Sequence, residues 1–218
     1  MCATFNRIDP VEPFTTIAGV AAPLPRENID TDVIMPKQFL KGITRNDLAR
    51  GLFYDLRFDA SGREREDFIL NQPPYRQPSF LIVGPNFGCG SSREHAVWGL
   101  AQFGIRGILG TSFASIFQDN CFRNGLLPVA LRAEQYDRIL KLCSDPGHNR
   151  LSIDLRSQLV TLADGTPIPF SVDEMRRGDL LNGRDPIAST LRFAEDILAF
   201  ERDHWSAQPW LKPPAAPS

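Results

Sequence analysis

The stretch from Phe80 to Gly104 gathers residue types that could bind and act on an anion. Its glycine-rich loop is followed by two hydroxyls and a guanidinium, on Ser91, Ser92 and Arg93. Glycines let a ligand approach the main chain, and the start of a helix offers N–H groups without internal partners and a positive dipole end. A guanidinium binds a carboxylate through two parallel hydrogen bonds. The stretch therefore predicts a site for a carboxylate or phosphate, with a hydroxyl placed to act on it.

A simpler interpretation of the same residues is a helix cap. Ser91 followed three residues later by Glu94 matches a capping box, in which the serine caps the helix and the glutamate reaches back. A cap needs neither the second serine nor the arginine, so it leaves part of the pattern unexplained. Cys89 lies inside the loop and could be a nucleophile, but the favoured interpretation is that it is simply a small buried residue of the loop. His95 lies one turn into the helix, where a structural hydrogen bond is favoured over acid–base catalysis.

A second group of polar residues lies between Asn28 and Leu40. Asp30 and Asp32 would point to the same side of an extended chain, with Thr31 between them, and could bind a metal or a polar ligand. They could equally cap turns, and from the residues alone the turn interpretation is favoured. Lys37 follows a proline and could be a fixed cation or a solvated surface residue.

The elements around these residues predict an α/β fold. Phe80–Val83 has the length and β-branched content of a buried strand, and the helix after it has Val97 and Leu100 on one face. A strand is also expected near Phe14–Ile17, ending before Pro23. The alternation continues with strands at 105–110 and 126–131 and with helices at 111–121 and 133–143. Short links between such elements imply parallel strands with right-handed crossovers.

The pattern changes after residue 150. Alternating apolar residues at 151–155 and 159–162, followed by Asp164-Gly165, predict an added antiparallel β unit. Helices are expected at 173–181 and from Asp185-Pro186, the latter with an apolar face of Ile187, Leu191, Ala194 and Leu198. The tail from Ser206 is rich in Pro and Ala and is predicted to be disordered. We therefore expect one domain over residues 1–205 and a tail over 206–218.

Composition argues against several classes of protein. The 218 residues are 42% hydrophobic and 23% charged, which suits a single packed domain. A net charge of −2 predicts no general attraction to nucleic acid or to acidic membranes. No apolar run approaches the roughly 18 residues of a membrane span, and no signal-peptide pattern is seen, so a cytoplasmic location is expected. The four cysteines are scattered, so neither a zinc site nor a self-contained iron–sulfur site is indicated.

Two segments together resemble the small subunits of 3-isopropylmalate dehydratase, a family of the aconitase superfamily. They are N-I-D-T-D-V-I-M-P-K-Q-F-L at Asn28–Leu40 and N-F-G-C-G-S-S-R-E-H at Asn86–His95. The 218-residue length fits a free-standing swivel subunit and is much too short for a whole aconitase. The resemblance implies an aconitase-type swivel domain, with a mostly parallel sheet flanked by helices and the antiparallel β unit added.

The resemblance also implies roles for individual residues. The first serine of G-S-S-R is the base of the superfamily, so Ser91 would remove the carbon-bound proton, with its alkoxide held by neighbouring N–H groups and the arginine. Arg93 would bind a substrate carboxylate, and Ser92 would help to bind a carboxylate or oxyanion. The Asp30–Asp32 loop, with Thr31, resembles the segment that closes over substrate, which raises its functional interpretation above the turn interpretation. Lys37 lies in the same segment and is assigned to substrate binding together with this loop.

Cofactor, partner and reaction are further implications of the resemblance. Family members bind a [4Fe-4S] cluster through cysteines of a large subunit, so the cluster is expected on that partner in a heterodimer or larger heteromer, and not on this chain. Its iron would act as a Lewis acid on a small dicarboxylate. The implied reaction converts 2-isopropylmalate into 3-isopropylmalate through isopropylmaleate, a step of leucine biosynthesis.

Three alternatives stay open at this point. A small subunit for another dicarboxylate, such as homoaconitate, citraconate, methylmalate or dimethylmaleate, would carry much the same motifs. A non-catalytic anion-binding module is the alternative from another class of protein. A serine hydrolase is disfavoured, because the sequence has no G-x-S-x-G elbow.

Overall fold

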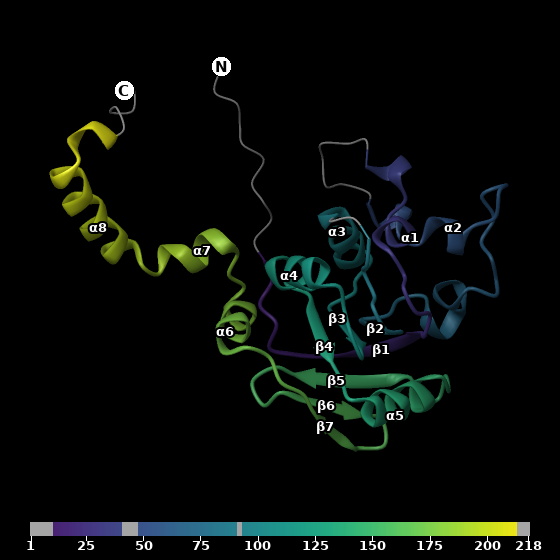
Figure 1. Cartoon of the computed structure of the whole chain (residues 1–218). Helices are drawn as coiled ribbons and strands as arrows, with labels where there is room; N and C mark the ends of the chain where they lie inside the picture. The colour runs from purple at the N-terminus through teal and green to yellow at the C-terminus, as the bar shows by residue number, and fades with distance from the viewer. Residues whose placement is uncertain (1–10, 41–47, 91–92, 213–218) are drawn as a thin grey trace.

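One seven-stranded sheet organises the part of the chain that this computed structural model describes, which is residues 11–40, 48–90 and 93–212. The strand order is β4-β3-β2-β1-β5-β6-β7 (Figure 1). The strands are β1 (Thr16–Leu24), β2 (Phe80–Val83), β3 (Gly107–Gly110), β4 (Leu127–Ala130), β5 (Arg150–Asp154), β6 (Leu159–Leu162) and β7 (Pro167–Pro169). Strands β1 to β4 pair in parallel and β5 to β7 join the other side of β1 antiparallel. The α/β class with an added antiparallel unit is confirmed, although half of the strand pairs are antiparallel.

Helices lie in each connection from β1 to β5, and more follow β7. The longer ones are α3 (Glu94–Gln102), α4 (Ser115–Arg123), α5 (Ala133–Cys143), α6 (Glu174–Asn182), α7 (Pro186–Leu191) and α8 (Ala194–Ala207). The short ones are α1 (Thr31–Ile34), α2 (Tyr54–Arg57) and the 3-10 turns η1 (Lys37–Phe39), η2 (Leu48–Gly51), η3 (Ile69–Asn71), η4 (Pro73–Tyr75) and η5 (Pro209–Leu211). None of the helices among the described residues has the length and apolar character to cross a membrane.

Strand β2 lies at the centre of two cores, because its side chains alternate between the two faces of the sheet. Leu81 and Val83 pack with α3 and the segments between β1 and β2. Phe80 and Ile82 pack on the opposite face, with α5 and the antiparallel strands. All four side chains are fully buried, as expected for a strand covered on both faces. This double burial fixes the carboxyl end of β2, from which the glycine loop leaves.

The predicted end of the first strand is wrong. Strand β1 continues through Pro23 to Leu24, and Pro23 pairs with Ile82 of β2. The antiparallel neighbour β5 pairs with β1 only from Thr16 to Val20. Pro23 therefore lies where β1 has a partner on one side only, and a proline without an N–H is tolerated at such a position.

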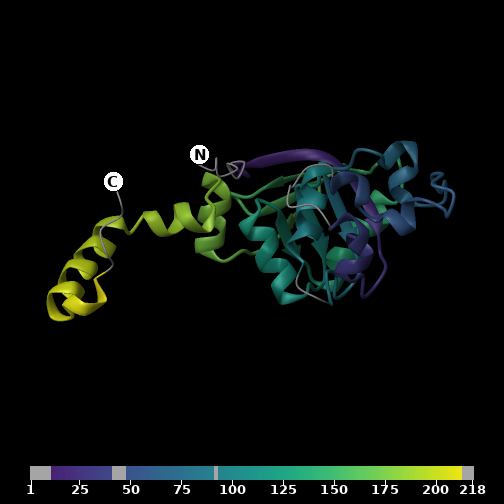
Figure 2. The ribbon, with the colours of Figure 1, turned by 90° about the horizontal axis from the view of Figure 1, so that it is seen from above.

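The C-terminal helices differ from the rest of the chain. Helices α7 and α8 extend away from the sheet and from α5 in both views (Figures 1 and 2). The expected helix from Asp185 is two helices, and neither contains a buried residue. Ser206 lies in α8 and η5 follows, so regular structure continues past the point where we expected a disordered tail to begin. Residues 213–218 lie outside the described part of the chain.

Candidate active site

The two segments that carry the sequence motifs lie side by side beyond the carboxyl ends of β1 and β2. Three backbone hydrogen bonds of 2.8–2.9 Å join them: Asn28 N to Pro85 O, Gly88 N to Ile29 O and Thr31 N to Cys89 O. The Asn86 amide also donates to Asn28 Oδ1 at 2.8 Å. These bonds continue the parallel pairing of β1 with β2, so the sheet itself brings the two motifs together.

The glycines of the loop are required by its backbone and its neighbours. Gly88 and Gly90 have φ values of +77° and +89°, in the left-handed region that side chains disfavour. A Cβ on Gly88 would lie 2.1 Å from the ring of Phe117. A Cβ on Gly90 would lie 3.3 Å from the Cβ of Asp30, within the facing motif. The loop can therefore approach α1 and α4 closely only because these positions lack side chains.

An ion pair between Arg93 and Asp32 connects the two motifs at the start of α3. The Arg93 Nη1 contacts the Asp32 Oδ1, and their side chains are 16% and 42% exposed, respectively. Arg93 is the N-cap residue of α3 and makes no side-chain capping hydrogen bond. Its guanidinium is therefore held at a helix start, largely shielded from solvent, by a carboxylate of the facing segment.

The capping-box interpretation is wrong, because the N-cap of α3 is Arg93 and Glu94 is its first residue, whereas the capping box needs Ser91 as N-cap. Glu94 accepts a hydrogen bond from the Asn124 amide at 2.8 Å, and Asn124 Oδ1 accepts one from Trp98 at 2.9 Å. Glu94 thus connects α3 to the end of α4. Ser91 and Ser92 lie outside the described residues, so their predicted roles stay predictions.

The two aspartates of the first motif have different positions. Asp30 is the N-cap of α1, and its Oδ1 accepts a hydrogen bond from Val33 N at 2.7 Å. The turn interpretation is therefore confirmed for Asp30, whereas Asp32 pairs with Arg93. Lys37 is exposed on η1 and is not among the described residues that line the adjacent pocket. Substrate binding by these residues stays a prediction.

A small pocket of about 160 Å³ opens beside Arg93. Its described lining consists of Thr31, Gly88, Gly90, Arg93, Ala114, Ser115, Ile116, Phe117 and Asn120. The pocket is smaller than the roughly 300–1,000 Å³ usual for drug-sized ligands. One cation, two small polar side chains of α4 and two apolar ones surround it. A small molecule with one carboxylate and a short apolar group suits this lining.

Sequence reasoning missed the wall of the pocket that α4 provides. The loop after β3 is held against the glycine loop by two hydrogen bonds, from Asn86 N to Ser112 Oγ at 2.9 Å and from Ala114 N to Phe87 O at 3.1 Å. Helix α4 then begins at Ser115, with its first turn at the pocket. The available signal was the rule that neighbouring parallel strands end at the same edge of a sheet, where ligands bind.

The other candidates from the sequence are His95 and the cysteines, and the structure describes their surroundings. The ring of His95 lies against that of Trp98, with centroids 4.6 Å apart, so its described contact is ring packing, and the structural hydrogen bond expected for it stays a prediction. Cys89 is half-buried, whereas Cys121 and Cys143 are buried, and all three are free thiols. Burial raises the pKa of the Cys121 thiol well above its usual value and that of Cys143 to about 11. Both buried thiols therefore stay protonated at neutral pH.

The donor groups in the described residues do not fit an iron–sulfur cluster. No group of three or more His, Cys, Asp or Glu side chains that could hold a metal ion occurs there. A cluster bound through several thiolates would need cysteines close together, and the two buried thiols belong to different cores. No step of the chemistry is therefore assigned to a metal on this chain.

Comparison with known proteins gives the family. Residues 11–134 match the family model of the aconitase C-terminal domain, and residues 187–214 match that of the C-terminal domain of the 3-isopropylmalate dehydratase small subunit. The chain is 52% identical to 3-isopropylmalate dehydratase small subunit 1 of Mannheimia succiniciproducens, over 93% of this chain and 100% of the relative. It is 50% identical to small subunit 2 of Salmonella typhimurium, over 95% of this chain and 99% of the relative.

A solved structure agrees with this relationship. A 3-isopropylmalate dehydratase (leuD) from Methanocaldococcus jannaschii superposes with a TM-score of 0.61 at 25% sequence identity, covering 85% of this chain and 99% of the other. The fold, the two adjacent motifs and the high identity over nearly the whole length agree with one another. The chain therefore belongs to the family of 3-isopropylmalate dehydratase small subunits of the aconitase superfamily.

Proposed function

We propose that this chain is the small subunit of a hydro-lyase that converts 2-isopropylmalate into 3-isopropylmalate through isopropylmaleate, in leucine biosynthesis. The observation that carries the proposal is the shielded Arg93, held by Asp32 at the edge of a small pocket where the two family motifs meet. Relatives about 50% identical over nearly their whole length are named 3-isopropylmalate dehydratase small subunits, which supports the reaction.

Arg93 would bind one carboxylate of the substrate. A guanidinium that is only 16% exposed interacts more strongly with an anion than one in bulk water, because the surroundings screen the charge less. Asp32 occupies only Nη1 in the described ion pair, and its role would be to orient the guanidinium. The apolar side chains of Ile116 and Phe117 would then face the branched alkyl group of the substrate.

Ser91 would act as the base, and this role rests on its place in the G-S-S-R motif between Gly90 and Arg93. It would take the proton from the carbon next to the one that bears the hydroxyl, while the hydroxyl leaves as water and isopropylmaleate forms. Water then adds back in the opposite sense: its oxygen bonds to the carbon that lost the proton, and the proton goes to the carbon that had borne the hydroxyl, which gives 3-isopropylmalate. Ser92 and Lys37 would assist in binding the carboxylates.

The large subunit would contribute the rest of the active site. Its [4Fe-4S] cluster would supply the Lewis acid that makes the substrate hydroxyl a better leaving group. This division of labour suits the described residues, whose donor groups do not fit a cluster. A cytoplasmic location is also part of the proposal, because free thiols suit a reducing compartment.

The test is an assay of the chain expressed together with the large subunit of 3-isopropylmalate dehydratase from the same genome. The ultraviolet absorbance of the unsaturated product acid is followed with 2-isopropylmalate, homocitrate, citramalate and 2,3-dimethylmalate as substrates. We expect 2-isopropylmalate to have the highest kcat/KM and the chain alone to be inactive. A preference for a diacid without the isopropyl group would overturn the substrate assignment.

A variant of the proposed base tests the mechanism in the same assay. We expect Ser91→Ala to lower kcat by at least about 100-fold, as loss of a general base does, while the complex still forms. Arg123→Ala, on the surface end of α4, serves as the control and should keep wild-type kcat. Near wild-type activity of Ser91→Ala in a complex of normal composition would reject the catalytic role of Ser91.

A further inference from the structure

The C-terminal arm, defined as residues 186–212 with α7, α8 and η5, exposes most of the large apolar side chains found on the surface of the described chain. Eight of them lie on the arm and are 36–76% exposed: Ile187, Leu191, Phe193, Ile197, Leu198, Phe200, Trp210 and Leu211. Outside the arm, Ile116 at the pocket and Met175 on α6 are the only other exposed large hydrophobic residues in the described ranges. The exposed apolar surface is thus concentrated in one segment.

The arm is held to the body at its base. Asp179 of α6 accepts a hydrogen bond from Ser189 Oγ at 3.0 Å and lies 3.9 Å from Arg192 Nη1. Beyond Arg192, the one side-chain hydrogen bond described is internal to α8, from Ser206 Oγ to Arg202 O at 2.7 Å. Figures 1 and 2 show α8 standing clear of the sheet and its helices. The apolar side chains of the arm therefore have no partner surface within the described part of the chain.

The exposed area is large enough for a stable interface. An aromatic side chain covers about 150–250 Å² when fully buried and Ile and Leu cover less, so the eight exposed fractions leave a mostly apolar surface on the order of 800 Å². The largest apolar patch on a typical monomer is about 300–600 Å². A specific protein interface buries about 800 Å² on each partner. The arm alone thus provides the area that one side of such an interface needs.

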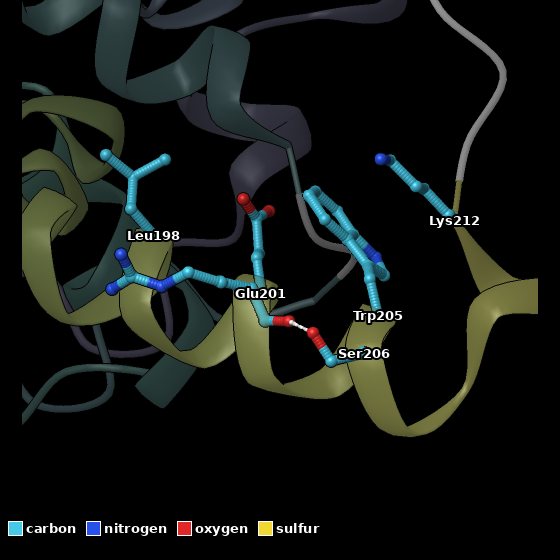
Figure 3. Close-up of a pocket in the computed structure, with 6 residues that line it drawn as sticks. Leu198, Glu201, Trp205, Ser206 and Lys212 are labelled. Carbon is cyan, nitrogen blue, oxygen red and sulfur yellow. Dashed lines mark hydrogen bonds between the residues drawn. The ribbon is translucent and has the colours of Figure 1, made fainter.

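The surface of α8 also has the mixed composition of an interface. A groove of about 480 Å³ runs along the helix, lined by Leu198, Glu201, Arg202, Trp205, Ser206 and Lys212. Leu198, Glu201 and Trp205 project from the same side of α8, and Lys212 lies across from Trp205 (Figure 3). An apolar centre with charged groups at its rim is typical of protein interfaces. Amphipathic helices with such faces bind in apolar grooves of a partner.

We propose that the C-terminal arm is the docking element of this chain for the large subunit. The inference rests on the proposed function, because that function requires a cluster-bearing partner. Two observations favour this occupant. The arm matches a family model of its own, named for the 3-isopropylmalate dehydratase small subunit, whereas the aconitase C-terminal domain model ends at residue 134. The model that covers the arm is thus named for chains that are separate subunits, and such chains need a non-covalent attachment.

A second copy of this chain is the competing occupant, and the body offers little to receive the arm. Apart from Ile116 and Met175, no large hydrophobic residue of the described body is exposed, so a second copy could bind only arm to arm. The large subunit would cover the arm and close the open side of the pocket in one complex. The arm contributes none of the described residues that line that pocket, so docking and chemistry are separable by mutation.

The experiment compares Phe200→Ser with Asp203→Ser, both on exposed faces of α8, in the full-length chain. The dissociation constant for the purified large subunit is measured by biolayer interferometry, and kcat is measured at saturating small subunit. We expect Phe200→Ser to weaken binding by at least about 10-fold, with kcat restored at saturation, and Asp203→Ser to bind within about twofold of wild type. Circular dichroism and the unfolding midpoint check that both variants are folded. Trp210→Ser is a second arm variant and should behave like Phe200→Ser.

The outcomes separate this inference from the proposed function. If the wild-type chain does not bind the large subunit at all, the proposed function fails. If the wild-type complex forms and is active, but Phe200→Ser and Trp210→Ser bind equally well, the arm is not the docking element and the proposed function stands. If light scattering shows that the chain alone is a dimer that these variants dissociate, while binding to the large subunit is unchanged, the arm binds a second copy and the inference is overturned.

Discussion

The sheet edge that carries the pocket and the C-terminal arm differ in how their side chains are held. At the sheet edge, buried strands and backbone hydrogen bonds fix polar groups, and the Arg93–Asp32 pair is held between two motifs. On the arm, apolar side chains are fixed only by their own helix and stay exposed. The first region is preorganised within the chain, whereas the second is complete only against another surface. One chain can therefore carry both a site that its own fold assembles and a surface that needs a partner.

The largest expected effect is on the free energy of unfolding, which should differ between a variant beneath the sheet edge and a variant of the arm. Leu100 of α3 is fully buried in the core that also holds Phe117, so Leu100→Ala removes packed contacts and leaves a cavity, which costs about 2–5 kcal/mol. Leu198 of α8 is 63% exposed, so Leu198→Ala should change the free energy of unfolding by less than about 0.5 kcal/mol. Urea denaturation of the isolated chain measures both. Equal losses would mean that the arm packs against the body in solution.

The next effect concerns the shielded cation. Arg93→Ala removes a charged hydrogen-bond donor from a site that is largely closed to solvent, so we expect kcat/KM to fall by about 100-fold or more. Arg93→Lys should recover only part of it, because an ammonium cannot bind a carboxylate through two parallel N–H groups. Arg156→Ala, exposed in the turn between β5 and β6, is the matched control for losing an arginine. Steady-state kinetics of the two-subunit enzyme provide the measurement. A small change for Arg93→Ala would exclude Arg93 from substrate binding.

The glycine loop should show a smaller but specific effect. Gly88→Ala places a Cβ 2.1 Å from the ring of Phe117 at a φ of +77°, so strain and overpacking should together cost about 2–4 kcal/mol. Gly165 has a φ of +80° with nothing within 4 Å of its Cβ position, so Gly165→Ala should cost only about 1–2 kcal/mol for backbone strain. The difference between the two unfolding free energies isolates the contact with Phe117. Equal costs would show that α4 does not press on the loop.

The contrast also explains which features could be predicted from sequence. Residues 133–143 were predicted as a helix with the bounds that α5 has, because a strong 3.6-residue periodicity and clear end signals lie within that segment. The capping-box interpretation of Ser91 and Glu94 was wrong, since Arg93 is the N-cap of α3 and Glu94 bonds to Asn124 at the end of α4. The strand through Pro23 depends on where β5 stops pairing. Such features are set by tertiary contacts that local patterns do not contain.

The candidate site was predictable in its motifs and not in its full lining. The resemblance placed Asp32 and Arg93 at one site, and the structure brings them into contact. Asn120 and Ile116 of α4 line the same pocket, but nothing near them in sequence marks them as site residues. The apolar face of the arm was visible as a periodic pattern at Ile187, Leu191 and Leu198. The pattern predicts that this face packs against something, but not that the face stays exposed in the described part of this chain.

The smallest expected effect concerns how readily a small reagent alkylates the cysteine in the glycine loop. Cys89 is half-buried in the glycine loop, whereas Cys121 and Cys143 are buried and burial raises the pKa of the Cys143 thiol to about 11. At pH 8, iodoacetamide reacts with thiolates, so Cys89 should be alkylated in the folded chain while the two buried thiols react only after unfolding. Peptide mapping by mass spectrometry separates the sites, and the peptide of Cys2, which lies outside the described residues, is scored by itself.

Alkylation of Cys89 should also slow the enzyme modestly, because the added group lies beside Thr31 and Gly90 at the pocket. Cys89→Ser is the control, since it should keep activity and lose its sensitivity to the reagent. Saturating 2-isopropylmalate should protect Cys89 if the substrate occupies this pocket. Labelling of Cys121 as fast as Cys89 would show that the core beneath the site opens readily, because Cys121 packs in the same core as Phe117 of the pocket. The distinction between a preorganised edge and an incomplete arm would then lose its physical basis.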